Sequence, residues 1–210
     1  MKKILITAIA AVAFVAPALA QDDDDRNVLH FGAKAGINIS NIYDSDDDQL
    51  EADSKVGFVG GGFISIPIGT YLGVQPEVLF SQKGFKGNGN FLGVDYGFSR
   101  TTNSLDIPIY LQFKPVPYTT ILFGPQYSFL LSQTDKFNAG NLSNQEQEDF
   151  SNDNIRKNIF GLAAGLDINI SRLVIGGRVA WDLQNNNGDG TSDTPRYKNV
   201  WGQITAGFRF

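Results

Sequence analysis

The chain has 210 residues, and 22 acidic against 17 basic side chains give it a formal net charge of −5. With 42% hydrophobic and 19% charged residues, an intrinsically disordered chain is excluded. The sequence contains no cysteine and one histidine, which excludes disulfides, thiolate metal sites and multi-histidine metal centres. A net acidic chain without a basic block also lacks the charge that nucleic-acid binding needs, so no nucleic-acid partner is expected.

The first twenty residues have the three parts of a secretory signal peptide. The start is basic, Ile4–Val15 is an apolar run, and Ala18–Ala20 is a cleavage site of the small-x-small type. The apolar run is too short for a membrane-spanning helix. We therefore expect residues 1–20 to be removed on export, residues 21–27 to form an acidic periplasmic tail, and residues 28–210 to form the folded domain.

The rest of the sequence alternates apolar and polar residues with a period of two, which predicts β-strands. Each segment has about 9–11 residues, the length of a strand that crosses a membrane at a tilt. The connections alternate between short and long, and the long ones are rich in Asp, Asn, Gly and Ser. The eight predicted strands are Leu29–Ile39, Val56–Ile66, Leu72–Phe80, Leu105–Phe113, Ile121–Leu131, Phe160–Ile170, Leu173–Leu183 and Val200–Phe210.

An even number of strands with alternating short and long connections is typical of an outer-membrane β-barrel. Closure of the sheet leaves no strand edge with unpaired N–H and C=O groups in the hydrocarbon. We therefore predict an all-β fold: an eight-stranded antiparallel transmembrane up-and-down barrel in the bacterial outer membrane. Its short turns are expected in the periplasm and its long loops outside the cell.

One face of the predicted strands is almost entirely apolar, whereas the other carries glycine, glutamine, serine and charges. Turning the strands over would expose Lys34, Arg178 and Arg209 to lipid, where a basic residue costs about 2–4 kcal/mol at the bilayer midplane. The apolar face is therefore expected to contact lipid. The alternative is a soluble periplasmic barrel that encloses an apolar ligand. The predicted polar network of the lumen consists of Lys34, Gln75, Glu77, Asp106, Gln112, Gln126, Asp167, Arg178, Asp182, Gln203 and Arg209.

Four segments of the sequence resemble the PorT-type outer-membrane β-barrel family: Phe31–Asn38, Gln75–Gly84, Leu105–Pro108 and Phe123–Pro125. The resemblance covers the whole mature chain and implies a small eight-stranded barrel in the outer membrane. The terminal Phe210 is similar to the aromatic end that the barrel-assembly machinery reads, so the resemblance implies that machinery as a partner. It implies no particular activity.

The sequence gives little support for catalysis. A hydrolytic triad needs a base beside a nucleophile, and the only histidine, His30, lies at the start of the first strand on the short-turn side. Asp106, Asp167 and Asp182 remain candidates for an acid–base pair if they meet in the lumen, although buried carboxylates there are more often structural. We expect no enzyme and no cofactor. A narrow, low-conductance pore is the alternative function, with salt bridges of the lumen acting as a gate.

Acidic residues in the first and last long loops are weak candidates for binding Ca²⁺, because oxygen ligands at alternating positions suit that ion. The EF-hand pattern is missing, since position six from Asp44 is Gln49 rather than glycine. The simpler interpretation is a solvated acidic loop, or one that holds divalent ions bridging to lipopolysaccharide. The weak candidate ligands are Asp44, Asp46, Asp48, Asp189 and Asp193.

The long loops are the places where a partner outside the cell would bind. The Asn88–Asn90 segment predicts a turn. Alternation persists in Phe91–Ser99, so the third and fourth strands are expected to continue as a hairpin with an edge for a partner strand. We therefore predict a non-enzymatic envelope scaffold or surface-interaction protein, in contact with outer-membrane lipid and lipopolysaccharide. Aromatic residues in the loops are Tyr43, Phe85, Phe91, Phe98, Phe137 and Phe150.

Overall fold

A computed structural model describes six stretches of the chain, and all of their regular structure is β-strand. No described segment forms a helix long and apolar enough to cross a membrane. The described residues are 24–43, 53–91, 94–139, 142–148, 157–186 and 197–210.

Nine strands make one antiparallel sheet. Five of them follow the positions of predicted strands closely, β3 to β5 extend well beyond the bounds predicted for them, and β6 is additional. The strands are β1 (His30–Tyr43), β2 (Asp53–Pro67), β3 (Leu72–Phe91), β4 (Val94–Val116), β5 (Thr119–Ala139), β6 (Leu142–Glu148), β7 (Asn158–Ile170), β8 (Leu173–Asp182) and β9 (Lys198–Arg209).

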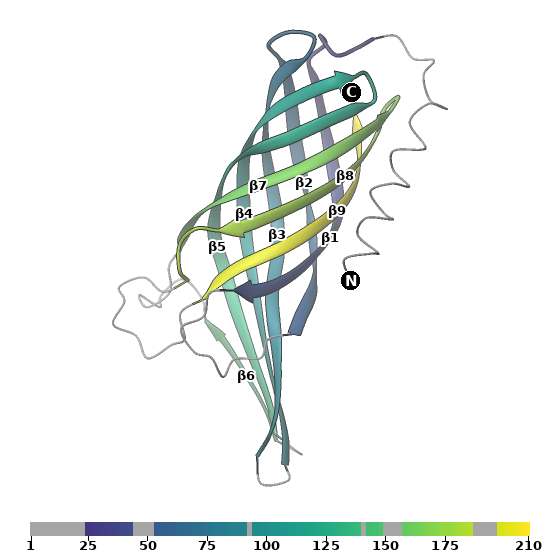
Figure 1. The fold of residues 1–210 in the computed structure, drawn as a ribbon. Coiled ribbons are helices and arrows are strands. Elements are labelled where there is room, and N and C mark those ends of the chain that lie inside the picture. The colour runs from purple at the N-terminus through teal and green to yellow at the C-terminus, as the bar shows by residue number, and fades with distance from the viewer. Residues whose placement is uncertain (1–23, 44–52, 92–93, 140–141, 149–156, 187–196) are drawn as a thin grey trace.

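Eight of the nine strands close into a barrel, because the last strand pairs back onto the first (Figure 1). The β1–β9 ladder runs from Gly32 opposite Arg209 to Tyr43 opposite Lys198. Beyond it, the backbone N–H of Phe210 donates to the carbonyl of Phe31 at 2.8 Å. The wall therefore has no open edge at its seam, and the predicted eight-stranded barrel is confirmed.

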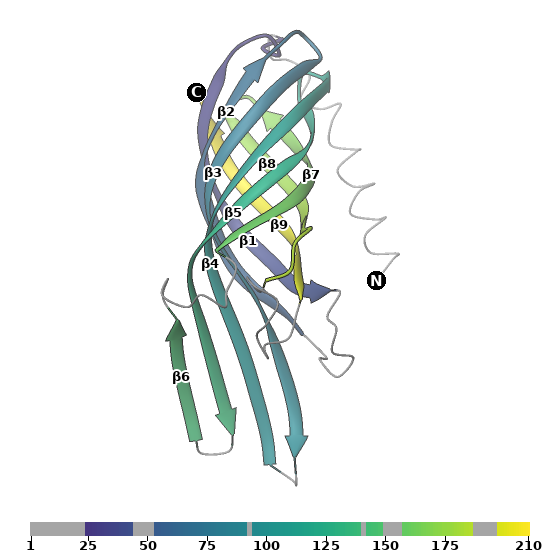
Figure 2. The ribbon, with the colours of Figure 1, turned by 90° about the vertical axis from the view of Figure 1, so that its left-hand side faces the viewer.

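The barrel strands β3, β4 and β5 continue past the rim, and the additional strand β6 pairs with the end of β5 there. The β3–β4 ladder reaches the pair Phe91 and Val94, and β6 pairs with the end of β5 from Gln133 to Ala139. Figure 2 shows these strands projecting from the end of the barrel that lies away from the C-terminus. We call this part, residues 82–91, 94–103, 132–139 and 142–148, the outer extension.

The outer extension confirms the predicted long hairpin and shows that the predicted turn at Asn88–Asn90 is wrong. These three residues pair with Asp95–Gly97 inside the β3–β4 ladder. Cross-strand pairing satisfies their backbone groups, and this outweighs the local turn preference of Asn and Gly. The expected loop over residues 132–159 is likewise in part strand, since β5 runs on to Ala139 before β6 begins.

The wall is apolar outside and polar inside. Leu111, Ile204 and Phe31 point outward with 64, 58 and 56% of their surface exposed, whereas Glu77 and Asp106 on the inner face are 1% exposed. An exposed apolar wall suits hydrocarbon and not water, so the alternative of a soluble barrel around an apolar ligand is wrong. The exposed phenylalanines near the two ends of the wall are Phe31, Phe58, Phe80, Phe113, Phe160, Phe208 and Phe210.

The short connections all lie at the end of the barrel where the C-terminus lies, as Figure 1 shows. They are residues 68–71, 117–118 and 171–172. Ser171 has a φ of 52°, the left-handed region that a two-residue hairpin turn requires. This end of the barrel is the periplasmic end, because outer-membrane barrels keep their short turns there.

We expect the folded barrel to migrate differently from the boiled protein on a detergent gel, and we expect the β1–β9 seam to control this shift. A Cβ at Gly36 would lie 1.9 Å from the carbonyl oxygen of Ile204, so Gly36→Ala forces the seam apart and reduces the shifted fraction. The matched change Gly202→Ala, on the other strand of the seam, meets no atom within 4 Å and leaves the shift unchanged. An equal loss in both variants would contradict this account of closure.

Candidate functional site in the barrel interior

Four charged side chains on four strands form a neutral cluster inside the barrel near its periplasmic end. Lys34 Nζ of β1 lies 2.5 Å from Glu77 Oε2 of β3. Arg178 of β8 binds both oxygens of Asp167 of β7, at 2.7 and 2.8 Å, and lies 3.8 Å from Glu77. The four side chains are at most 6% exposed. Two cations and two anions therefore compensate one another where water is excluded, as a stable buried charge requires. We call these four residues the inner charge cluster.

Amide side chains continue the inner charge cluster towards the periplasm. Gln75 Nε2 donates to Glu77 Oε1 at 2.7 Å, and Gln112 Nε2 donates to Gln75 Oε1 at 2.6 Å. Ser65 Oγ donates to Gln112 Oε1 at 3.0 Å, and Lys114 Nζ lies 3.5 Å from Ser65. The predicted glutamines therefore serve as bridges between charges on different strands.

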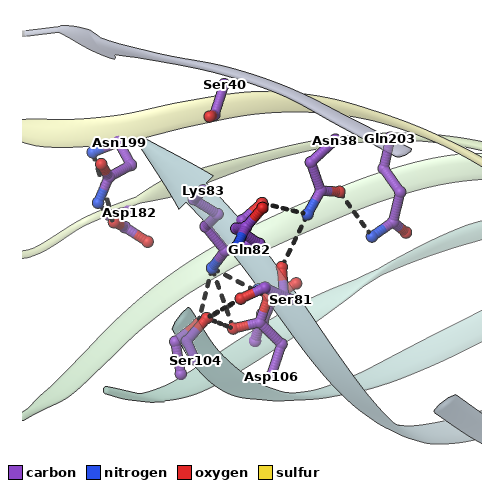
Figure 3. Close-up of polar contacts among 12 residues, drawn as sticks. Asn38, Ser40, Ser81, Gln82, Lys83, Ser104, Asp106, Asp182, Asn199 and Gln203 are labelled. Atoms are coloured by element: carbon purple, nitrogen blue, oxygen red, sulfur yellow. Dashed lines mark hydrogen bonds and ion pairs between the residues drawn. The ribbon is translucent and has the colours of Figure 1, made fainter. Parts of the chain in front are cut away.

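A second cluster lies closer to the extracellular end, and its central cation was missed by the sequence analysis. Lys83 Nζ lies 2.9 and 3.0 Å from the oxygens of Asp106 and 3.8 Å from the centre of the Trp201 ring. Figure 3 shows Lys83 and Asp106 pointing toward each other, with Ser104 donating to Asp106 at 2.9 Å. The predicted strand ended at Phe80, although inward positions continue through Ser81 to Lys83. We call Lys83, Asp106 and Trp201 the outer charge cluster.

Asp182 lies beside the outer charge cluster, where Lys83 and Asp106 both act on it electrostatically. Its Oδ2 accepts a hydrogen bond of 2.6 Å from Asn199 Nδ2, as Figure 3 shows. Asp167, by contrast, is bound to Arg178 in the inner charge cluster. The three carboxylates considered as acid–base candidates are therefore split between two clusters, and each already has a partner.

Neutral polar side chains fill the space around the outer charge cluster. Asn38 Nδ2 donates to Ser81 Oγ at 2.9 Å, and Gln203 Nε2 donates to Asn38 Oδ1 at 3.2 Å (Figure 3). Gln126 Nε2 donates to Ser128 Oγ at 3.3 Å. These residues are all buried, and they leave little room for a continuous water path.

The extracellular rim holds an arginine and two buried rings that the sequence analysis placed in loops or did not single out. Arg100 binds both oxygens of Asp135, at 2.8 and 2.6 Å, and donates to Tyr197 Oη at 3.2 Å. The Phe85 ring packs edge-on against Tyr197, with centroids 5.1 Å apart. Burial raises the pKa of Tyr197. The alternation through Phe98 and Arg100 was the signal that could have found this group.

At the periplasmic mouth, the segment before β1 folds over the barrel end. Asp25 Oδ2 lies 2.7 Å from Arg209 Nη2 and 3.4 Å from His30 Nε2. Arg26 Nη1 donates to the carbonyl of Lys114 at 3.2 Å, and Lys114 Nζ donates to the carbonyl of Arg26 at 3.2 Å. Asp25 and Arg26, within the expected acidic tail, thus contact the rim of the barrel. A cavity of about 20 Å³ remains among these residues, room for about one water molecule.

Asp24 is held by the same segment. Arg26 Nη2 and Nε donate to its two oxygens at 2.6 and 2.8 Å. The side-chain hydrogen bonds from Arg26 lower the pKa of Asp24 to about 2, so this pair stays ionised at every physiological pH.

The described residues contain no group of three or more His, Asp or Glu placed to hold a metal ion. The weak candidate ligands Asp44, Asp46, Asp48, Asp189 and Asp193 lie outside the described residues, as does Phe150. Calcium binding in those loops stays a prediction.

An apolar outer wall, a closed antiparallel sheet and an interior of paired charges define an integral outer-membrane β-barrel protein. The chain belongs to the family described as the outer membrane protein beta-barrel domain, whose model matches residues 19–187. No sequence match to a curated protein was found.

The fold is similar to that of Ail, the attachment invasion locus protein of Yersinia pestis, with a TM-score of 0.51 and 16% sequence identity. The similarity covers 86% of this chain and 98% of the Ail chain. A structure of Ail in complex with the heparin analogue sucrose octasulfate gives a TM-score of 0.50 at 16% identity, covering 87% of this chain and 99% of that one. Identity at this level is evidence of a shared fold alone.

We expect Lys83→Met to lower the free energy of unfolding by about 3–5 kcal/mol, because it leaves Asp106 charged and unpaired in the interior. The double variant Lys83→Met/Asp106→Asn removes both charges and is expected to recover much of that loss. Arg172→Gln removes one positive charge from an exposed turn and is expected to change stability by less than about 0.5 kcal/mol. Urea unfolding in lipid vesicles, followed by tryptophan fluorescence, measures all three. A loss under about 1 kcal/mol for Lys83→Met would contradict the pairing.

Proposed function

We propose that the protein is a non-enzymatic envelope barrel whose outer extension makes contacts at the cell surface. The observation that carries this proposal is the outer extension itself. In the described sheet, β6 pairs with β5 alone, and Gly87–Phe91 of β3 pairs with β4 alone. Strand edges that keep unpaired N–H and C=O groups are templates to which a partner strand can add.

The surroundings of the only histidine support a role without catalysis. His30 lies at the periplasmic mouth, where its Nδ1 is 3.3 Å from the carbonyl oxygen of Phe210 and its Nε2 faces Asp25. These partners are a carboxylate and a backbone carbonyl, and neither is a nucleophile that a histidine base would activate.

A narrow pore is the second candidate function, and one observation favours it. Polar side chains form an unbroken series from Lys114 at the mouth through Ser65, Gln112 and Gln75 to the inner charge cluster. Two features argue against conduction. Every charge in that cluster is paired, and an eight-stranded barrel is only wide enough for its own side chains. We therefore propose that the resting lumen is closed.

Export, assembly and the surrounding lipid are part of the same proposal. Residues 1–20 would direct export, and Phe210, which stacks on Phe31 with centroids 5.6 Å apart, would be read by the barrel-assembly machinery. The four sequence segments noted above support a place in the PorT-type branch of the family. Outer-leaflet lipopolysaccharide would surround the wall.

Cysteine labelling tests the proposed topology, because the natural sequence has no cysteine. We expect a membrane-impermeant maleimide to label Lys136→Cys, in the outer extension, on intact cells. The matched variant Arg172→Cys lies in a periplasmic turn and should react only after the outer membrane is made permeable. Labelling of Arg172→Cys on intact cells, or protection of Lys136→Cys, would overturn the orientation.

Recording in planar bilayers tests the closed lumen. We expect the wild-type barrel to show no steady openings, because its charges are paired and its interior is filled. Steady openings that disappear in Arg178→Ala would instead establish a pore that runs past the inner charge cluster. Arg172→Gln is the control for loss of a positive charge outside the lumen.

A further inference from the structure

The outward face of the outer extension changes from apolar to polar to basic with distance from the membrane. The lipid-facing wall ends with Phe80 of β3, which lies opposite Leu105 of β4. In an antiparallel ladder, directly opposed residues point to the same face. Each set of opposed residues on β3, β4 and β5 beyond Phe80 therefore forms a row on one face of the sheet.

The first row beyond Phe80 on this face is polar and uncharged. Gln82 Nε2 donates to Asn103 Oδ1 at 3.1 Å, and Asn103 Nδ2 donates to Ser132 Oγ at 3.0 Å. The three side chains join β3, β4 and β5 by hydrogen bonds. At this row the outward face is therefore no longer apolar.

Two rows further out, the same face becomes basic. Lys86 of β3 lies opposite Ser99 of β4, and Ser99 lies opposite Lys136 of β5. Lys86 and Lys136 are exposed and therefore flank Ser99 on the outward face.

Lys55 of β2 adds a third ammonium group to this face. Its Nζ donates to Ser99 Oγ at 2.9 Å and to Thr101 Oγ1. Ser99 and Thr101 are the neighbours of the inward-facing Arg100 in β4, so their side chains lie on the outward face. Its side chain passes over Gly84, where a Cβ would lie 3.2 Å from Lys55 Cδ. Glycine, with a φ of 151° here, leaves the room for this crossing. We call Lys55, Lys86 and Lys136 the lysine row.

Among the residues that the structure describes, the lysine row carries more positive charge than its neighbours compensate. Asp53 lies opposite Lys86 in the β2–β3 ladder, whereas Asp135 is engaged by Arg100. Burial is the main reason that the pKa of Lys55 is lowered, and the charges of Lys86 and Lys136 add to it. Three cations gathered on one face of a chain whose net charge is −5 mark a surface suited to an anion.

We propose that the lysine row binds phosphate groups of lipopolysaccharide in the outer leaflet. Lys86 lies six residues beyond Phe80, about 20 Å along the strand, whereas the Lys55 side chain lies beside Gly84, two residues nearer the membrane. Long lysine side chains can reach back towards the membrane. Acyl chains that pack on the apolar wall below would hold a phosphorylated headgroup at this height. A soluble anion gains nothing from that wall, so charge and position together favour the lipid. This inference rests on the proposed function in one respect, since it requires the outer extension to lie outside the outer membrane.

Binding of diphosphoryl lipid A to the full barrel in uncharged detergent micelles tests the proposal, with native mass spectrometry measuring the fraction of barrel that carries lipid. A lysine near an anionic surface contributes about fivefold in affinity. We expect Lys86→Gln and Lys136→Gln each to weaken binding by about fivefold, and the two together by about 25-fold. Lys136→Arg keeps the charge and should bind like the wild type. Monophosphoryl lipid A should bind more weakly, and phosphatidylcholine should give no lysine-dependent binding.

Arg172→Gln is the matched control, because it removes the same charge from an exposed residue at the periplasmic end. If Arg172→Gln weakened lipid A binding equally, the effect would come from net charge alone, and the proposal would be overturned. Wild-type binding by the Lys86→Gln/Lys136→Gln variant would also overturn it. Displacement of lipid A by millimolar inorganic phosphate would assign the row to a free anion instead of a lipid.

The maleimide experiment on Lys136→Cys separates the two levels of failure. If Lys136→Cys is labelled on intact cells and the lysine variants bind lipid A as the wild type does, this inference alone is wrong. If Lys136→Cys is protected on intact cells, the proposed function fails and the inference fails with it.

Discussion

The structure depends on one constraint: a backbone that crosses hydrocarbon must pair every N–H and C=O group within the protein. The β1–β9 ladder meets this constraint by joining the two ends of the folded chain, down to the bond between Phe210 and Phe31. Once the sheet is closed, strand alternation assigns one set of side chains to lipid and the other to a narrow interior. The apolar wall and the polar lumen are thus consequences of closure.

The polar interior follows from the same geometry and sets its own requirement. Charges inside a barrel of this size have no bulk water, so each needs a partner. Lys34 and Glu77, Arg178 and Asp167, and Lys83 and Asp106 meet across different strands. Such pairs tie together strands that are distant in sequence. They also occupy the space through which ions would pass, which is why a filled scaffold fits the geometry better than a channel.

Beyond the membrane the constraint no longer applies, and the sheet changes accordingly. The backbone of β3, β4 and β5 can hydrogen-bond to water above the rim, so the outer extension is an open sheet with β6 at one edge. One of its faces carries Arg100 and Asp135, and the other carries the lysine row. The surface properties of the protein are therefore concentrated in a part of the sheet that closure did not require.

The sequence by itself determined the number of barrel strands, the face that meets lipid and the end that carries the short turns, because alternation and segment length are local and the hydrocarbon acts on every strand alike. It predicted that the third and fourth strands continue as a hairpin, but it did not reveal that Asn88–Asn90 lies within β3 or that β5 continues to Ala139 and pairs with β6, since Asn88–Asn90 has the composition of a turn. It also did not predict that Lys83 lies in the lumen or that Asp25 contacts Arg209. Those outcomes were decided only by the tertiary structure, because each depends on a cross-strand or end-to-end partner that lies far away in the chain and is brought near by closure of the barrel.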